Sequence, residues 1–103
     1  MKIVLITGAG GGIGKQTALY FAKNNWTVIA TLHHSSEGED FKDISTIFCY
    51  EMDVTSTESI ASATKIILDN HPKIDTIINN AGMGPDLDQL IPDAVSFNST
   101  FEV

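Results

Sequence analysis

A buried strand that runs straight into a glycine-rich turn is the feature that most constrains this chain. Residues 3–6 are four consecutive apolar residues, and residues 7–14 read Thr-Gly-Ala-Gly-Gly-Gly-Ile-Gly. The apolar run is typical of a strand covered on both faces, as in a parallel sheet. Glycine permits positive φ and the close approach of a ligand, and the helix that follows directs free N–H groups at an anion. The segment therefore predicts a strand, a turn and a helix start that hold a diphosphate.

Apolar runs and helical periodicity alternate along the rest of the chain. We predict strands at 27–31, 46–50 and 75–78, helices at 13–24 and 57–70, a polar loop at 34–40 and another helix from about residue 86. Alternating strands and helices need crossover connections, so the expected fold class is α/β. We expect one domain over residues 1–103, with a three-layer, doubly wound parallel sheet of about four strands. Ligands of such sheets bind beyond the carboxyl ends of the strands.

Charge and composition exclude several kinds of partner. Thirteen acidic residues against six basic ones give a net charge of −7, so we expect neither nucleic acid nor a membrane as partner. The apolar run at 3–6 is too short for a signal peptide or a membrane span, so we expect a cytoplasmic protein.

Cys49 lies in an apolar run, which predicts a buried side chain. His33 and His34 should point to opposite sides of an extended chain, so we expect no metal site.

The glycine pattern distinguishes between known phosphate-binding motifs. The common G-x-G-x-x-G fingerprint would need glycine at position 13, where this chain has isoleucine, and a P-loop would need glycine at 9 and Ser or Thr at 16. The pattern T-G-x-x-x-G-x-G matches at Thr7, Gly8, Gly12, Ile13 and Gly14. In this respect the chain resembles the short-chain dehydrogenase/reductase family, which implies a Rossmann-like fold and a bound NAD or NADP.

Two further motifs follow in the order and on the elements that this resemblance implies. Asp53-Val54 follows the third predicted strand and is similar to the family's adenine-pocket pair, in which the acid meets the adenine amino group. Asn79-Asn80-Ala81-Gly82 follows the fourth strand and is similar to the turn that supports the sheet and borders the cofactor ribose. We therefore expect cofactor contacts from Asp53, Val54, Asn80, Ala81 and Gly82, besides those of the glycine turn.

Most of the catalytic residues that the resemblance implies have no counterpart here. The family uses a serine, a Tyr-x-x-x-Lys pair and an asparagine, and only the asparagine can be matched, at Asn98. Tyr20 and Lys23 have the wrong spacing, and we expect Tyr20 to pack against the sheet. We therefore expect an oxidoreductase-type chain that binds its cofactor but turns over little substrate by itself.

The end of the second predicted strand bears on the choice of cofactor. A dehydrogenase that prefers NAD carries an acid here to hold the ribose 2′-hydroxyl, but this chain has Leu32 followed by His33. With no carboxylate to repel a 2′-phosphate and a histidine to meet it, the sequence favours NADP over NAD.

Two alternatives remain open from the sequence. The chain could be a stand-alone dinucleotide-binding sensor or regulatory module. It could also be completed by a partner chain, because the apolar strand at 75–78 would form a sheet edge that invites pairing with a second copy.

Overall fold

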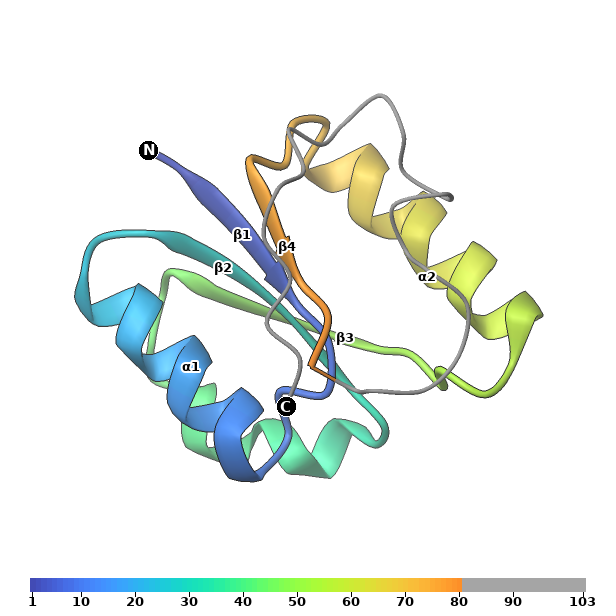
Figure 1. Ribbon diagram of the computed structural model, residues 1–103, viewed down its shortest axis with the longest axis horizontal. Coiled ribbons are helices and arrows are strands. Elements are labelled where there is room, and N and C mark those ends of the chain that lie inside the picture. Colours follow the sequence, from blue (N-terminus) through green and yellow to red (C-terminus); the bar gives the residue numbers. More distant parts are fainter. Residues whose placement is uncertain (81–103) are drawn as a thin grey trace.

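A four-stranded parallel sheet forms the centre of the computed structural model, which describes residues 1–80 (Figure 1). Its strands are β1 (Ile3–Ile6), β2 (Thr27–Leu32), β3 (Ile47–Glu51) and β4 (Thr76–Ile78). They lie in the order β3-β2-β1-β4, and every neighbouring pair is parallel. The predicted α/β class and doubly wound parallel sheet are therefore confirmed, while the helix predicted from residue 86 lies outside the described residues.

Helices cover the sheet on both faces and divide the core in two. Helix α1 (Gly12–Lys23) and the 3₁₀ helix η1 (Ser35–Phe41) lie on one face, and α2 (Thr57–Asn70) lies on the other. Along β1, Val4 and Ile6 join the core beneath α1, whereas Leu5 joins the core beneath α2. The strand alternation thus buries apolar side chains on both faces, as the uninterrupted run at residues 3–6 predicts.

Helix α1 turns a different face to the sheet from the one expected. Its buried residues are Gly14 and Ala18, while Tyr20 is 64% exposed and Ile13 is 57% exposed. The expectation that Tyr20 packs against the sheet was therefore wrong. Small residues at positions 14 and 18 let the helix axis approach the strands closely, which rotates the larger side chains outward.

The polar segment after β2 is ordered as a 3₁₀ helix, so its prediction as a loop was also wrong. The reason lies at its two ends. Phe41 is buried in the core beneath α1, and the Glu37 carboxylate accepts the N–H groups of His33 and His34 at 3.0 and 3.3 Å. An apolar anchor and a side-chain cap stabilise helical turns that the composition alone disfavours.

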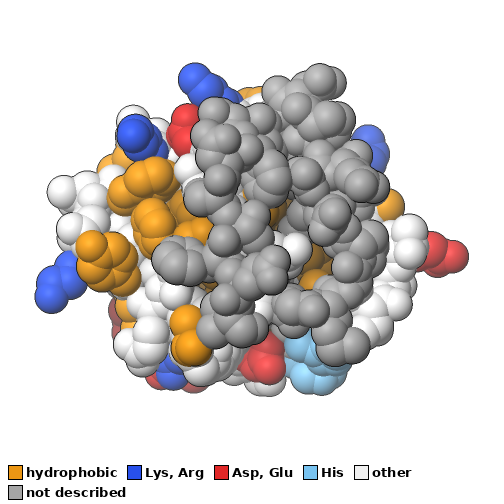
Figure 2. All heavy atoms as spheres, in the orientation of Figure 1, with side chains coloured by type: hydrophobic (Ala, Val, Ile, Leu, Met, Phe, Trp, Pro, Cys, Tyr) orange, Lys and Arg blue, Asp and Glu red, His pale blue; other side chains and the backbone are white. Residues whose placement is uncertain are grey.

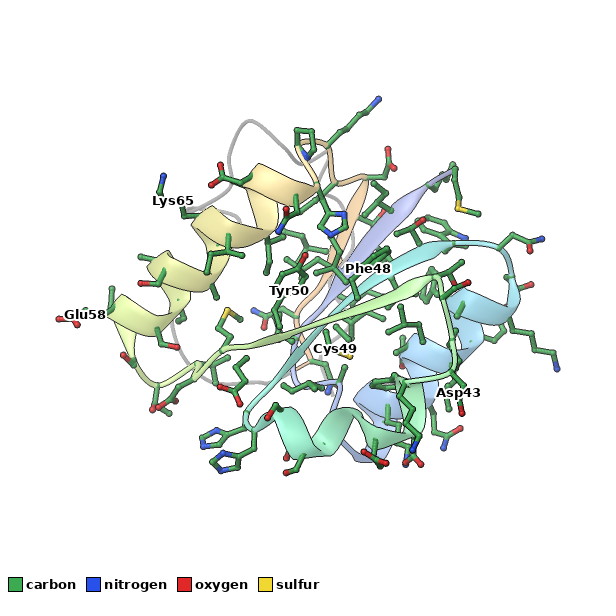
Figure 3. The ribbon with its side chains drawn as sticks, turned by 180° about the vertical axis from the view of Figure 1, so that it is seen from behind. Asp43, Phe48, Cys49, Tyr50, Glu58 and Lys65 are labelled. Carbon is green, nitrogen blue, oxygen red and sulfur yellow. The ribbon has the colours of Figure 1, made fainter. Side chains whose placement is uncertain are left out.

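Strand β3 is one outer strand of the described sheet, so several of its side chains are exposed. Figure 3 shows Phe48, Cys49 and Tyr50 along this strand. Cys49 is exposed, contrary to the prediction that it is buried, because β3 pairs with β2 on one side and is an outer strand of the described sheet on the other. Partial burial still raises the pKa of its thiol, so the thiolate is disfavoured at neutral pH.

Strand β4 is the other outer strand of the described sheet. It has only three residues, although the Asp75 N–H extends the pairing by donating to the Ile3 carbonyl at 2.9 Å. The sheet edge expected at residues 75–78 is therefore short, with three residues in the strand itself. Within residues 1–80, no helix is both long and apolar enough to cross a membrane.

Candidate functional site

The glycine turn between β1 and α1 depends on three glycines for two different reasons. Gly8 and Gly12 have φ values of 64° and 58°, a region that strains residues with a side chain. Gly14 lies in the first turn of α1, where an added Cβ would stand 2.2 Å from the Gly8 carbonyl oxygen and 2.5 Å from Asn80 Nδ2. The spacing of the T-G-x-x-x-G-x-G pattern therefore reflects two turn conformations and one close contact.

Thr7 connects this turn to the residues that follow β4. Its hydroxyl accepts the Asn80 N–H at 2.9 Å and donates to Asn79 Oδ1 at 3.1 Å, while Asn80 Nδ2 donates to the Gly8 carbonyl at 3.1 Å. On the other side of the turn, the Ala9 N–H donates to the Thr31 carbonyl at 3.0 Å. The ends of β1, β2 and β4 are therefore tied together, and the amide of Asn80 is used to hold the turn.

The outer side of the turn is open. A Cβ added at Gly11 or Gly12 would meet no atom of another element within 4 Å in the part of the chain that the structure describes, and both residues stand at the amino end of α1. Helix α1 has no acidic residue in its first turn, its N-cap residue Gly11 has no side chain, and no other side chain within residues 1–80 accepts a hydrogen bond there. Free space before unbonded N–H groups fits a phosphate-bearing ligand.

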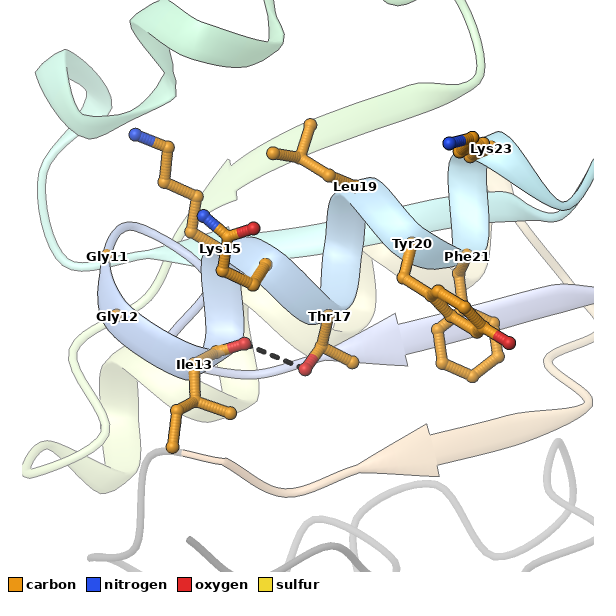
Figure 4. Close-up of a pocket in the computed structure, with 10 residues that line it drawn as sticks. Gly11, Gly12, Ile13, Lys15, Thr17, Leu19, Tyr20, Phe21 and Lys23 are labelled. Atoms are coloured by element: carbon orange, nitrogen blue, oxygen red, sulfur yellow. Dashed lines mark hydrogen bonds between the residues drawn. The ribbon is translucent and has the colours of Figure 1, made fainter.

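A hollow of about 1040 Å³ extends from this opening along the outer face of α1, from Gly11 to Lys23 (Figure 4). Its far end is formed by Tyr20 and Phe21, whose rings meet edge to face at 5.9 Å. Figure 2 shows the apolar side chains that gather over α1. Most of this hollow lies away from the strand ends, so its size does not make it the ligand site.

A smaller cavity, of about 320 Å³, opens at the carboxyl ends of β1, β2 and β3. It is lined by Gly8, Thr31, Leu32, His33, Met52, Val54 and Asn80. This is the place where doubly wound sheets bind their ligands, and four predicted contact residues meet in it: Gly8, His33, Val54 and Asn80. Sequence reasoning missed Thr31 and Met52, because a threonine inside a strand and a methionine after one carry no distinctive pattern.

Asp53, beside this cavity, is fixed by the beginning of α2. Its N–H donates to Ser59 Oγ at 2.9 Å, and its carbonyl accepts the Ser56 N–H at 3.0 Å. The Thr55 hydroxyl and then the Thr55 N–H, both donating to Asp53 Oδ1, hold the pKa of this carboxyl below its ordinary value. Asp53 Oδ2 accepts no hydrogen bond from the described residues, so it can accept one from a ligand.

Both histidines follow β2, and two carboxylates, Glu37 of η1 and Glu51 of β3, accept backbone N–H groups beside them. The rings of His33 and His34 lie 4.4 Å apart, so the prediction that they point to opposite sides was wrong. The strand ends at Leu32, and the next two N–H groups turn toward one oxygen of Glu37 instead of alternating. Glu51 accepts the Ser35 N–H at 2.7 Å, which, with the Ser35 hydroxyl, lowers its pKa. Figure 2 shows histidine side chains at the lower rim of the molecule.

The remaining predicted residues divide into two groups. Ile13 points away from the sheet and lines the hollow along α1. Ala81, Gly82 and Asn98 lie outside the described residues. Among residues 1–80, no group of three or more His, Cys, Asp and Glu side chains has the geometry of a metal site.

Comparison with known proteins gives consistent relatives. The family model described as short chain dehydrogenase matches residues 2–103. A 3-oxoacyl-[acyl-carrier-protein] reductase of Thermotoga maritima is 35% identical over 94 residues, which cover 82% of this chain and 37% of that protein. The chain spans only 15–37% of the length of the curated relatives that it matches.

Solved structures show the same similarity. A 3-ketoacyl-(acyl-carrier-protein) reductase from Brucella melitensis, complexed with NADH, is 29% identical with a TM-score of 0.72, covering 81% of this chain and 35% of that one. The protein ElxO with NADP bound is 34% identical with a TM-score of 0.70, covering 80% and 35%. Because the family model covers nearly the whole chain and the sheet order and glycine turn agree with it, this chain belongs to the short-chain dehydrogenase family.

Proposed function

We propose that this chain is the dinucleotide-binding part of an oxidoreductase that transfers hydride between NAD(P) and an alcohol or carbonyl compound. One observation carries the proposal: the glycine turn leaves free space before Gly11 and Gly12, at the amino end of α1 and beside the cavity at the strand ends. Backbone N–H groups at such a helix start would hold the pyrophosphate without any basic side chain. The cofactors named for two similar structures, NADH and NADP, support this choice.

The proposed contacts follow from the positions described above. Gly8, Gly12, Ile13 and Gly14 belong to the phosphate turn, with Ile13 acting through its backbone because its side chain points outward. Asp53 and Val54 would meet the adenine, and His33 would lie near the adenosine ribose. Asn80 supports the turn and borders the cavity, and Ala81 and Gly82 stay predicted contacts. We further propose a single domain over residues 1–103 in a cytoplasmic protein.

Catalysis by these 103 residues alone is a separate matter. Asn98 stays the one predicted catalytic residue, and the family's serine and Tyr-x-x-x-Lys pair have no match in this sequence. We therefore expect cofactor binding with little or no turnover. Robust oxidation of NADH or NADPH in the presence of ketones and aldehydes would contradict that expectation. A sensor module would show the same binding without turnover, and a chain completed by a second copy across β4 would sediment as a dimer.

The decisive experiment is a calorimetric titration of the purified chain with NADH and, separately, with NADPH. The Gly12→Val variant should abolish binding, because valine is strained at φ 58° and its side chain enters the space before the turn. Ala61→Val places the same side chain on an exposed site of α2 and should leave binding unchanged. If the wild-type chain binds neither cofactor, the proposed function is wrong.

A further inference from the structure

The carboxylate of Glu37 lies between the glycine turn and the end of β2. Its Oε1 atom accepts the N–H groups of His33 and His34 at 3.0 and 3.3 Å. The same atom would stand 2.4 Å from a Cβ added at Gly10, so the carboxylate rests directly on the turn. Glu37 is five residues beyond Leu32, the strand end at which the sequence lacks an acid, and the fold of η1 returns it there.

This carboxylate already accepts the two backbone N–H groups at the end of β2 that would otherwise be free to hold a 2′-phosphate. Two converging N–H groups at the end of a strand are suitable donors for an anion, and Glu37 already uses both. A 2′-phosphate would have to displace the carboxylate and would also be repelled by its charge. A free 2′-hydroxyl has neither difficulty, because it can donate a hydrogen bond to a carboxylate oxygen.

The surroundings reinforce the negative charge. Glu51 and Asp53 carry lowered pKa values, so both are ionised at neutral pH, and no Lys or Arg is among the residues that line the cavity at the strand ends. We propose that Glu37 makes this site selective for NAD(H) over NADP(H), which reverses the preference that the sequence alone suggests. This inference rests on the proposed function, because it needs a dinucleotide bound at this turn.

The test compares the dissociation constants of NADH and NADPH for the wild-type chain and for Glu37→Gln. The amide oxygen of glutamine can still accept the two N–H groups, so the variant keeps the cap but loses the charge. We expect the wild-type chain to bind NADH more tightly. In Glu37→Gln the ratio should move toward NADPH by about tenfold to a hundredfold, the range for a hydrogen bond to a charged group.

Controls separate selectivity from stability and from net charge. Glu39→Gln removes the same charge from an exposed residue that pairs with Lys42, and it should leave the ratio unchanged. Glu37→Asp keeps the charge and should keep the preference for NADH. If Glu37 has a purely structural role, Glu37→Gln would weaken the binding of NADH and of NADPH equally.

Two results would overturn the inference while leaving the proposed function intact: a wild-type chain that binds NADPH as tightly as NADH, or an unchanged ratio in a folded Glu37→Gln variant. Should that variant fail to fold, as judged by circular dichroism, the wild-type ratio and Glu37→Asp decide the matter. Absence of binding by either cofactor would contradict the proposed function itself.

Discussion

The carboxyl ends of β1 and β2 lie side by side, yet they are held in different ways. At the end of β1, Thr7, Gly8 and Gly14 are packed against Asn80 with little space to spare. At the end of β2, the backbone N–H groups of the residues that follow the strand donate hydrogen bonds to the carboxylates of Glu37 and Glu51. One end is thus fixed by close contact and the other by charge.

This difference explains why the two ends should respond differently to mutation. A close backbone contact cannot relax, so a single added methyl group must move a whole turn. Exposed charges sit in water, which screens them and can replace their partners. Close packing therefore characterises the β1 end, and the β2 end is where we propose that the two cofactors are discriminated.

The largest effect is expected from Gly14→Ala. The new Cβ would stand 2.2 Å from the Gly8 carbonyl oxygen, and overpacking of this kind costs about 3 kcal/mol. Alanine regains only about 1 kcal/mol over glycine inside a helix, so we expect a net loss of about 2 kcal/mol in urea unfolding. Gly11→Ala, with extended φ and no neighbour within 4 Å, is the matched control for stability. Equal stabilities of the two variants would show that the turn is not closely packed.

The next effect in size contrasts two buried threonines. Thr7→Val removes the acceptor of the Asn80 N–H and should cost about 1–2 kcal/mol, because a part-buried donor is left unpaired. Thr31 is also buried, but its hydroxyl has no hydrogen-bond partner within residues 1–80. Thr31→Val should therefore be neutral or slightly stabilising. Thermal unfolding of both variants measures the contrast, and similar losses in the two would contradict it.

The smallest effect concerns the charged end and depends on pH. The pKa values of Glu51 and Asp53 are lowered from 4.5 and 3.8, so both groups bind protons more weakly in the folded state. Their contribution to stability is present above these values and is lost as the pH falls through the lower folded pKa values. The double variant Glu51→Gln/Asp53→Asn should lose less stability on acidification below pH 4.5 than the wild-type chain does.

The pH range separates the effect of these two carboxylates from a loss of stability that depends on His71. Burial lowers the pKa of His71 from its ordinary value of 6.5, so protonation of this histidine begins to cost stability as the pH falls below 6.5, above the ordinary pKa values of the two carboxylates. An acid unfolding curve of the double variant that matches the wild-type curve below pH 4.5 would show that the carboxylates of Glu51 and Asp53 contribute nothing to stability.

Much of the fold could be predicted because local patterns agree with it. The apolar run at residues 3–6 determines a strand buried on both faces, and Ser56 caps α2 by accepting the Ser59 N–H at 3.2 Å. The outward turn of Tyr20 could not be predicted, because the rotation of α1 is set by the space between helix and sheet. The exposure of Cys49 likewise depends on β3 being an outer strand, which no local pattern encodes.

The same division holds for the candidate site. The sequence by itself determined the glycine turn, because positive φ at Gly8 and Gly12 and the close approach at Gly14 are properties that glycine alone supplies. The surroundings of the turn depend on long-range packing. The buried Phe41 anchors η1, and η1 carries the Glu37 carboxylate back onto Gly10, a contact between residues 27 positions apart. Charge near a ligand is set by distance in space, and distance along the chain does not reveal it.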